Sequence, residues 1–238
     1  MTEKEQALLA QVLNLFAQKF DRKAVLRGGM VLRILGSPRF TNDLDYVFAP
    51  YRSKKDIVDE ILTCLEAIEG ATIKHSLNSK CLRVIVSTDG ATIQIEAKVA
   101  EEVKTETVST RLFSTQFGLP QRLIHVQDYA VALAHKMAAW NERRLIRDLY
   151  DIWFYLQMNI KPDRGTLEQR LKKPSYSRIL KSKDHFSGQT IEEFYDFIRA
   201  KAAVLSDEDI AQELTDYLPQ EEITGLSMLF RAALNKLR

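Results

Sequence analysis

The stretch LRGGMVLRILGSPRFTNDLD, residues 26–45, decides how the first half of the chain folds. An apolar run enters the pair Gly28-Gly29, which predicts a strand that ends in a backbone turn. The apolar residues at 30–35 predict a short helix, which the following Gly-Ser-Pro sequence ends. Residues 43–48 alternate between polar and apolar side chains, as a half-buried strand does. The fold therefore begins as strand, turn, short helix and strand.

Strands and helices alternate through the rest of the first half, whereas the second half is helical throughout. The expected strands cover residues 72–77, 81–87, 91–97 and 122–126, and the expected helices cover 3–19, 53–68 and 128–156. Asp89-Gly90 is a signal for a tight hairpin between two of the strands. Because helices alone fill the second half, we expect a sheet-containing lobe over 1–126 and an all-helical lobe over 127–238.

The composition is that of an ordinary folded protein, with 45% hydrophobic and 28% charged residues in a chain of 238. No apolar run approaches the roughly 18 residues that a membrane span needs. The N-terminus is acidic and polar, where a secretory signal would be basic and then apolar. We therefore expect a cytoplasmic protein with no membrane partner. Cys64 and Cys81 lack the spacing of a zinc site and are interpreted as buried thiols.

Charge is unevenly distributed, although the net charge is only +2. The segment 161–183 contains two acids and eight basic residues: Lys161, Arg164, Arg170, Lys172, Lys173, Arg178, Lys181 and Lys183. An acidic stretch follows it, to residue 222. This asymmetry points weakly to an anionic partner at the basic segment.

Asp43 and Asp45 are two residues apart on an expected strand, so both carboxylates project from one face and reach the same metal ions. Two hard cations such as Mg²⁺, held by oxygen ligands, neutralise a triphosphate and align the attacking and leaving atoms. The Gly28-Gly29 turn lets backbone N–H groups approach the phosphates. Glu96 ends a strand that can lie beside the first. It is the candidate third ligand, which would bind the second metal and orient or deprotonate an attacking hydroxyl.

Each of these signals also has an ordinary structural interpretation. Most Asp-x-Asp sequences are solvated turns or strand edges, most Gly-Gly pairs are simple turns, and Glu96 alone would be a surface residue. Their order along the chain is more specific than any one of them. It is the combination that favours a site for a triphosphate and its metal ions.

A second cluster of charge lies between residues 136 and 151. On one continuous helix, four side chains would lie within about 80° of one another: Lys136, Arg143, Arg147 and Asp151. Such a stripe suits phosphate binding, because arginine forks match phosphate oxygens. The alternative is a solvated helix face with i,i+4 ion pairs, Arg144 with Asp148 or Arg147 with Asp151. A helix break near Asn141 would also spoil the stripe.

Together the two clusters resemble the AbiEii/AbiGii family of nucleotidyltransferase toxins, relatives of the MenT toxins within the DNA polymerase β-like nucleotidyltransferase superfamily. The family pattern of Gly-Gly or Gly-Ser, then Arg-Phe-Ser-x-Asp-Leu-Asp, is matched by Gly28-Gly29 and RFTNDLD, residues 39–45. Its later pattern, a lysine and then Arg-x-x-x-Arg-Asp-Leu-Tyr-Asp, is matched by Lys136 and RRLIRDLYD, residues 143–151. The two motifs span residues 26 to about 156.

The resemblance implies an α/β nucleotidyltransferase fold, with a mixed-sheet catalytic lobe and a helical lobe that completes the cleft for nucleotide and acceptor. It implies metal-dependent transfer of a nucleotidyl group from a nucleoside triphosphate. RNA, particularly a tRNA 3′ end, is the implied acceptor. A cognate antitoxin protein is the implied partner.

The resemblance also assigns roles by position. Asp43 and Asp45 would bind metal, Lys136 would contact the triphosphate, and Arg39 would join the triphosphate site or brace its loop. Four residues would build or brace the phosphate-binding face: Arg143, Arg147, Asp148 and Asp151. Met30 departs from the pattern, since many relatives place Thr or Ser there, and a hydroxyl that could hold a phosphate is missing.

Other functions stay open at this point. The same chemistry could act on a protein side chain or a small molecule. The basic segment also fits a binding module that keeps the fold and holds RNA or a protein, although clustered carboxylates would repel RNA. A glycosyltransferase Asp-x-Asp site is a remoter alternative, because a glycine pair precedes the acids and no other sugar-nucleotide signature is present.

Overall fold

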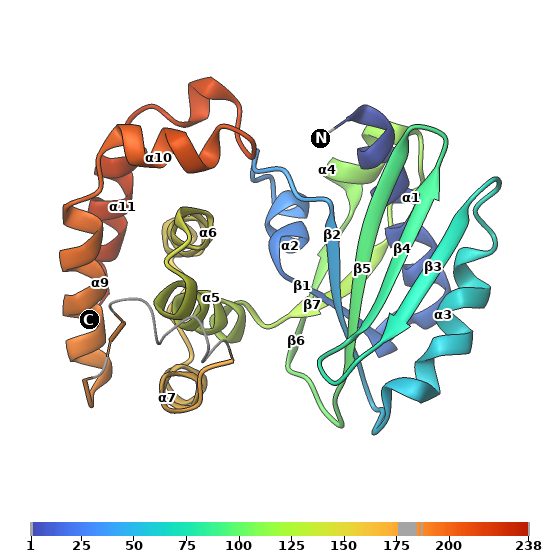
Figure 1. Ribbon diagram of the computed structural model, residues 1–238, viewed down its shortest axis with the longest axis horizontal. Coiled ribbons are helices and arrows are strands. Elements are labelled where there is room, and N and C mark those ends of the chain that lie inside the picture. Colours follow the sequence, from blue (N-terminus) through green and yellow to red (C-terminus); the bar gives the residue numbers. More distant parts are fainter. Residues whose placement is uncertain (1, 176–184, 187, 238) are drawn as a thin grey trace. The chain divides into compact units, whose positions relative to one another are not determined.

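The computed structural model describes residues 2–175, 185–186 and 188–237. The chain forms two compact units, Met1–Gln127 and Asp128–Arg238, each with buried apolar side chains of its own. The first unit contains a sheet with helices, and the described part of the second is helical (Figure 1). The predicted α/β fold is therefore confirmed.

The sheet has seven strands in the order β3-β4-β5-β2-β1-β7-β6. Their bounds are β1 Ala24–Arg27, β2 Asp43–Phe48, β3 Thr72–Leu77, β4 Leu82–Thr88, β5 Ala91–Val99, β6 Thr105–Ser109 and β7 Leu123–Gln127. β1 pairs with β7 and β2 with β5 in parallel, and the other neighbours are antiparallel. The sheet is thus mixed, as the family resemblance implied.

Helices α1 (Glu3–Phe20) and α3 (Val58–Leu65) lie on one face of the sheet (Figure 1). α1 begins at a capping box formed by Thr2 and Glu5, and its apolar side is buried. Rings from α1 and from β2 pack together there: Phe16, Phe20, Tyr46 and Phe48. Because strand side chains alternate, burial of this face directs the polar residues of β2 and β5 to the opposite face.

The first unit contains one strand that the sequence did not predict. β6 is an edge strand of mostly exposed polar residues that pairs only with β7. The short helices α2 (Gly29–Ile34) and α4 (Arg111–Ser114) complete the regular α-helices of this unit. A 3₁₀ turn, Lys54–Ile57, precedes α3, and Ser53 caps it as expected.

The second unit corrects the prediction of one helix over residues 128–156. Two helices, α5 (Tyr129–Arg143) and α6 (Ile146–Gln157), replace it. Arg144 adopts φ +57°, in the left-handed region, which ends α5. The further described helices are α7 Arg164–Lys172, α9 Ile191–Ala203, α10 Asp207–Leu214 and α11 Leu226–Leu234. α5 packs on α6 and α7, while α11 packs on α6 and α9.

Three members of the basic segment, Arg178, Lys181 and Lys183, lie outside the described residues. Both cysteines are buried free thiols, as predicted. Over the described ranges, no helix has the length and apolar character that a membrane crossing requires.

Candidate active site

The predicted carboxylates lie on neighbouring strands at the middle of the sheet. β2 pairs in parallel with β5, so that Asp43 is opposite Gln94 and Asp45 is opposite Glu96. Directly paired residues project from the same face, and so do residues two apart on a strand. Asp43, Asp45 and Glu96 therefore share the polar face of the sheet.

The backbone of Gly28 packs closely against the Asp45 carboxylate. It precedes α2 with φ +78° and ψ −156°, a conformation that is essentially restricted to glycine. A Cβ atom added to Gly28 would overlap Oδ2 of Asp45. Two independent causes, the backbone angle and the close approach, therefore require glycine at this position.

Gly29 is packed in the same way against Arg39. A Cβ atom on Gly29 would overlap Nη2 of Arg39. Arg39 is buried, its backbone N–H donates to Oγ of Ser37 at 3.2 Å, and Nη1 donates to the carbonyl of Phe40 at 3.2 Å. In this structure Arg39 thus braces the loop between α2 and β2 and places a guanidinium beside the glycine turn.

Glu96 has cationic neighbours that the sequence did not single out. Nη2 of Arg83 donates to Oε1 of Glu96 at 2.8 Å, and Gln94 donates to the same oxygen at 3.4 Å. Lys98 is also close. Burial lowers its pKa, the charge of Arg27 lowers it further, and the charges of Asp45 and Glu96 oppose that change. The acids of this face are therefore interleaved with cations.

These contacts bear on the predicted three-acid metal cage. Asp43 and Asp45 offer hard oxygen ligands from one face, beside a turn where the backbone comes close, and this donor set fits Mg²⁺. Glu96 is on the same face but binds Arg83. Among the described residues, no three His, Cys, Asp or Glu side chains gather as a set of metal ligands. The predicted cage is thus not assembled in this conformation, although its members are adjacent in the sheet.

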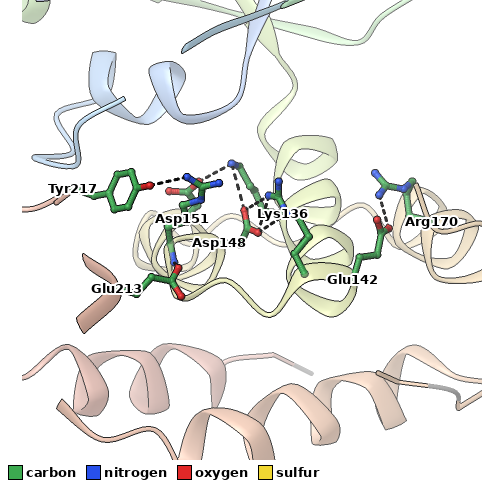
Figure 2. A network of polar contacts seen from close by, with 9 residues as sticks. Lys136, Glu142, Asp148, Asp151, Arg170, Glu213 and Tyr217 are labelled. Carbon is green, nitrogen blue, oxygen red and sulfur yellow. Dashed lines mark hydrogen bonds and ion pairs between the residues drawn. The ribbon is translucent and has the colours of Figure 1, made fainter. Parts of the chain in front are cut away.

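The cationic cluster of the helical unit is built around two buried aspartates (Figure 2). Nζ of Lys136 lies 2.6 Å from Asp151 and 3.9 Å from Asp148. Arg143 donates to both oxygens of Asp148, with Nη2 at 2.6 and 2.7 Å and Nε at 3.0 Å. Asp148 and Asp151 are each only 1% exposed. They act as counter-ions that hold Lys136 and Arg143 in place.

The helix break does not separate these residues. Lys136 and Arg143 come from α5 and the aspartates from α6, and the packing of α5 on α6 brings them together. The predicted stripe along one helix is wrong in its geometry, but its first and last members, Lys136 and Asp151, are in contact. Asp151 also influences Tyr155, whose pKa is raised by burial first and then by the charges of Asp151 and Tyr129.

Arg147 is held by residues far away in sequence (Figure 2). Its backbone N–H donates to Oε1 of Glu213 at 3.1 Å, and Nη1 donates to the hydroxyl of Tyr217 at 3.1 Å. Its guanidinium carbon lies 5.4 Å from the centre of the Tyr217 ring. Figure 2 also shows a separate pair, Arg170 with the buried Glu142, at 2.6 Å.

These sites can be compared with known proteins. A family model described as "Nucleotidyl transferase AbiEii toxin, Type IV TA system" matches residues 8–236, nearly the whole chain. The chain belongs to the AbiEii family. Membership makes it a nucleotidyltransferase of a toxin family. No curated protein sequence matches the chain.

Solved structures share the AbiEii-type fold at low sequence identity. MenT4, a nucleotidyltransferase toxin from Mycobacterium tuberculosis, matches with a TM-score of 0.57 and 18% identity, over 99% of this chain and 84% of that one. JHP933 from Helicobacter pylori matches with a TM-score of 0.54 and 11% identity, over 99% of this chain and 92% of that one. At such identities the likeness supports the fold alone.

The predicted site residues thus fall into two groups, each within one unit. The sheet unit brings together Gly28, Gly29 and Arg39 with the acids Asp43, Asp45 and Glu96. The helical unit brings together Lys136, Arg143, Asp148 and Asp151, with Arg147 nearby on α6. Sequence reasoning missed the cations beside Glu96, although the period of two along β4 and β5 places Arg83 and Lys98 on the same face.

Proposed function

We propose that this AbiEii-family enzyme transfers a nucleotidyl group from a nucleoside triphosphate to the 3′ end of an RNA, with tRNA as the acceptor. The observation that carries the proposal is the pair Asp43 and Asp45 on one face of β2, with Asp45 against the Gly28 turn. In the reaction the RNA 3′ oxygen bonds to the α-phosphorus. The bond from that phosphorus to the β-phosphate oxygen breaks, and pyrophosphate leaves.

The reaction is proposed to depend on Mg²⁺, with two ions as the family chemistry implies. Asp43 and Asp45 would hold the metal through carboxylate oxygens, and Glu96 would join them when its contact with Arg83 is released. The bound metal supplies charge neutralisation at the transferring phosphate. A Glu96 carboxylate freed in this way would also accept the proton of the attacking hydroxyl.

The triphosphate is proposed to contact Lys136, Arg143 and Arg147. The first two are each held by a buried aspartate, so their positions are fixed before the nucleotide arrives. Such preorganisation lowers the entropic cost of binding. An arginine has five N–H donors, and the hydrogen bond from Nη1 of Arg147 to Tyr217 occupies one of them, which leaves others for phosphate oxygens.

The toxin role also belongs to this proposal. A protein of the family described for type IV toxin–antitoxin systems is expected to have an antitoxin encoded with it. A protein side chain or a small molecule as acceptor would use the same residues. The identity of the labelled product distinguishes these cases.

The test is to incubate the protein with Mg²⁺, total tRNA and each of the four α-labelled nucleoside triphosphates in turn. The matched control is the same tRNA after periodate oxidation, which removes the 3′-terminal hydroxyls. Label on intact tRNA and not on oxidised tRNA is the expected result. Label on the oxidised tRNA as well, or on protein only, would overturn the 3′-end assignment.

A further inference from the structure

A cavity lies inside the helical unit, apart from Lys136 and its aspartates. Its volume is about 270 Å³, and its walls come from the C-terminal part of α6, the loop to α7, α9 and the residues after α11. Leu156, in the wall, is nine residues along the chain from Arg147, which is roughly 14 Å along a helix. The cavity is therefore separate from the phosphate-binding cluster proposed above.

The floor of the cavity is apolar and held in place. Leu156, Tyr195 and Leu237 line it and are each at least 95% buried. Arg199 on α9 donates to the carbonyl of Leu237 at 2.9 Å, which ties the last residues of the described chain to α9. Asp163 caps α7 by accepting from the backbone of Thr166 at 2.8 Å, which fixes the loop on the other side.

The rim of the cavity is positively charged. Lys161, Arg164 and Lys236 lie there. Arg164 is neutralised by Glu192, with Nη2 2.5 Å from Oε1. Lys161 and Lys236 have no ion-pair partner among the residues that the structure describes. The mouth thus presents two ammonium groups above an apolar floor, without a carboxylate paired to either among the described residues.

We propose that this cavity binds one nucleoside monophosphate, with the base on the apolar floor and the phosphate between Lys161 and Lys236. A phosphate monoester carries about −1.5 to −2 charges at neutral pH, which matches the two lysines. The volume of about 270 Å³ is slightly below the roughly 300–1,000 Å³ of small-molecule pockets, so it suits one small nucleotide rather than a stretch of polymer. Lys161 and Arg164 begin the basic segment seen in the sequence, which this site explains in part.

The test measures binding of AMP, GMP, CMP and UMP by titration calorimetry, without Mg²⁺, on the full chain carrying Asp45→Asn. Adenosine and inorganic phosphate are titrated beside them. We expect at least one monophosphate to bind with a dissociation constant below about 1 mM. Adenosine and phosphate alone should each bind at least about tenfold more weakly, because each uses only half of the site.

Variants locate the binding. The double variant Lys161→Ala/Lys236→Ala should weaken monophosphate binding at least about tenfold, because it removes both charge-assisted contacts. Lys173→Ala, an exposed lysine of the same basic segment outside the cavity, should leave it within about twofold. No binding by any monophosphate would overturn the proposal. So would equal affinity in the double variant, or phosphate binding as tightly as the nucleotides.

Discussion

Gly28→Ala should separate the chemistry from the stability of the sheet unit. The added methyl group would meet the Asp45 carboxylate, while the rest of the polar face keeps its residues. The substitution changes no charge and removes no hydrogen-bonding side chain. A loss of transfer by the folded variant can therefore be assigned to the position of Asp45 and of the turn.

The magnitude follows from two features of Gly28. Its backbone, at φ +78° and ψ −156°, lies in a region that costs other residues on the order of 1–3 kcal/mol. Relief of the overlap with Oδ2 also requires Asp45 or the turn to move. A misplacement of about 1 Å at a reacting centre can cost about 100-fold in rate. We expect a stability loss of about 1–3 kcal/mol and a fall in transfer of about 100-fold.

Gly118→Ala provides the matched control. Gly118 also has a positive φ, +66°, but a Cβ atom there would meet no atom within 4 Å. Its stability loss should be about 1–2 kcal/mol, with transfer unchanged. Urea denaturation and transfer of labelled nucleotide are measured for both variants. Wild-type transfer by Gly28→Ala would refute the close packing of Asp45 against the turn as a requirement for activity.

Three further predictions concern other parts of the molecule. Asp148→Asn should lower the free energy of unfolding by about 3–5 kcal/mol in urea denaturation, because it leaves Arg143 without its buried counter-ion; a loss below about 1 kcal/mol would contradict this. Arg83→Gln should lower the Mg²⁺ concentration for half-maximal transfer several-fold, because the arginine competes with the metal for Glu96. An unchanged Mg²⁺ dependence would argue against Glu96 as a metal ligand. Burial raises the pKa of Cys64 to about 11. As the pH rises, the thiol of the unfolded chain ionises before the buried thiol of the folded chain. The contribution of Cys64 to the free energy of unfolding is therefore complete below the ordinary pKa near 9 and is lost as the pH rises to about 11. Cys64→Ala should flatten the pH dependence of denaturation over this range, and an identical profile would exclude the effect.

Local patterns predicted the sheet unit well. The alternation of 43–48, the glycine turn and the Asp89-Gly90 hairpin are decided by neighbours in sequence, and each appears as expected. β6 was not predicted, because an exposed edge strand has no buried face and so no alternation of apolar residues.

In the helical unit, local sequence patterns do not predict the features that depend on distant residues. The break at Arg144 is a left-handed arginine without a glycine or proline to signal it. The guanidinium of Arg144 packs over Trp140, with 4.4 Å from the guanidinium carbon to the ring centroid, and over Phe197 at 4.8 Å. Phe197 is far along the chain, so this conformation depends on tertiary contacts. The partners of Arg147, Glu213 and Tyr217, are likewise more than sixty residues away.

Some site residues could likewise be identified from local patterns, whereas others depend on tertiary contacts. Asp43 and Asp45 were identifiable because their spacing alone fixes a shared face. The Arg83 partner of Glu96 follows from the register of β4 against β5, which the Asp89-Gly90 hairpin sets, although the contact between the two side chains was not predicted. The roles of Asp148 and Asp151 as buried counter-ions required knowledge of their burial.

The most direct test of the account is nucleotidyl transfer by Asp45→Asn, measured beside Asp59→Asn. Asp59 is exposed on α3, on the other side of the sheet from the polar face, so its substitution changes the same charge away from the site. Both variants are compared with the wild type at saturating Mg²⁺ and nucleoside triphosphate, after their folding is verified by denaturation. The account predicts that Asp59→Asn keeps wild-type transfer and that Asp45→Asn loses it by at least about 100-fold. Equal transfer by the two variants would contradict the assignment of the active site to β2.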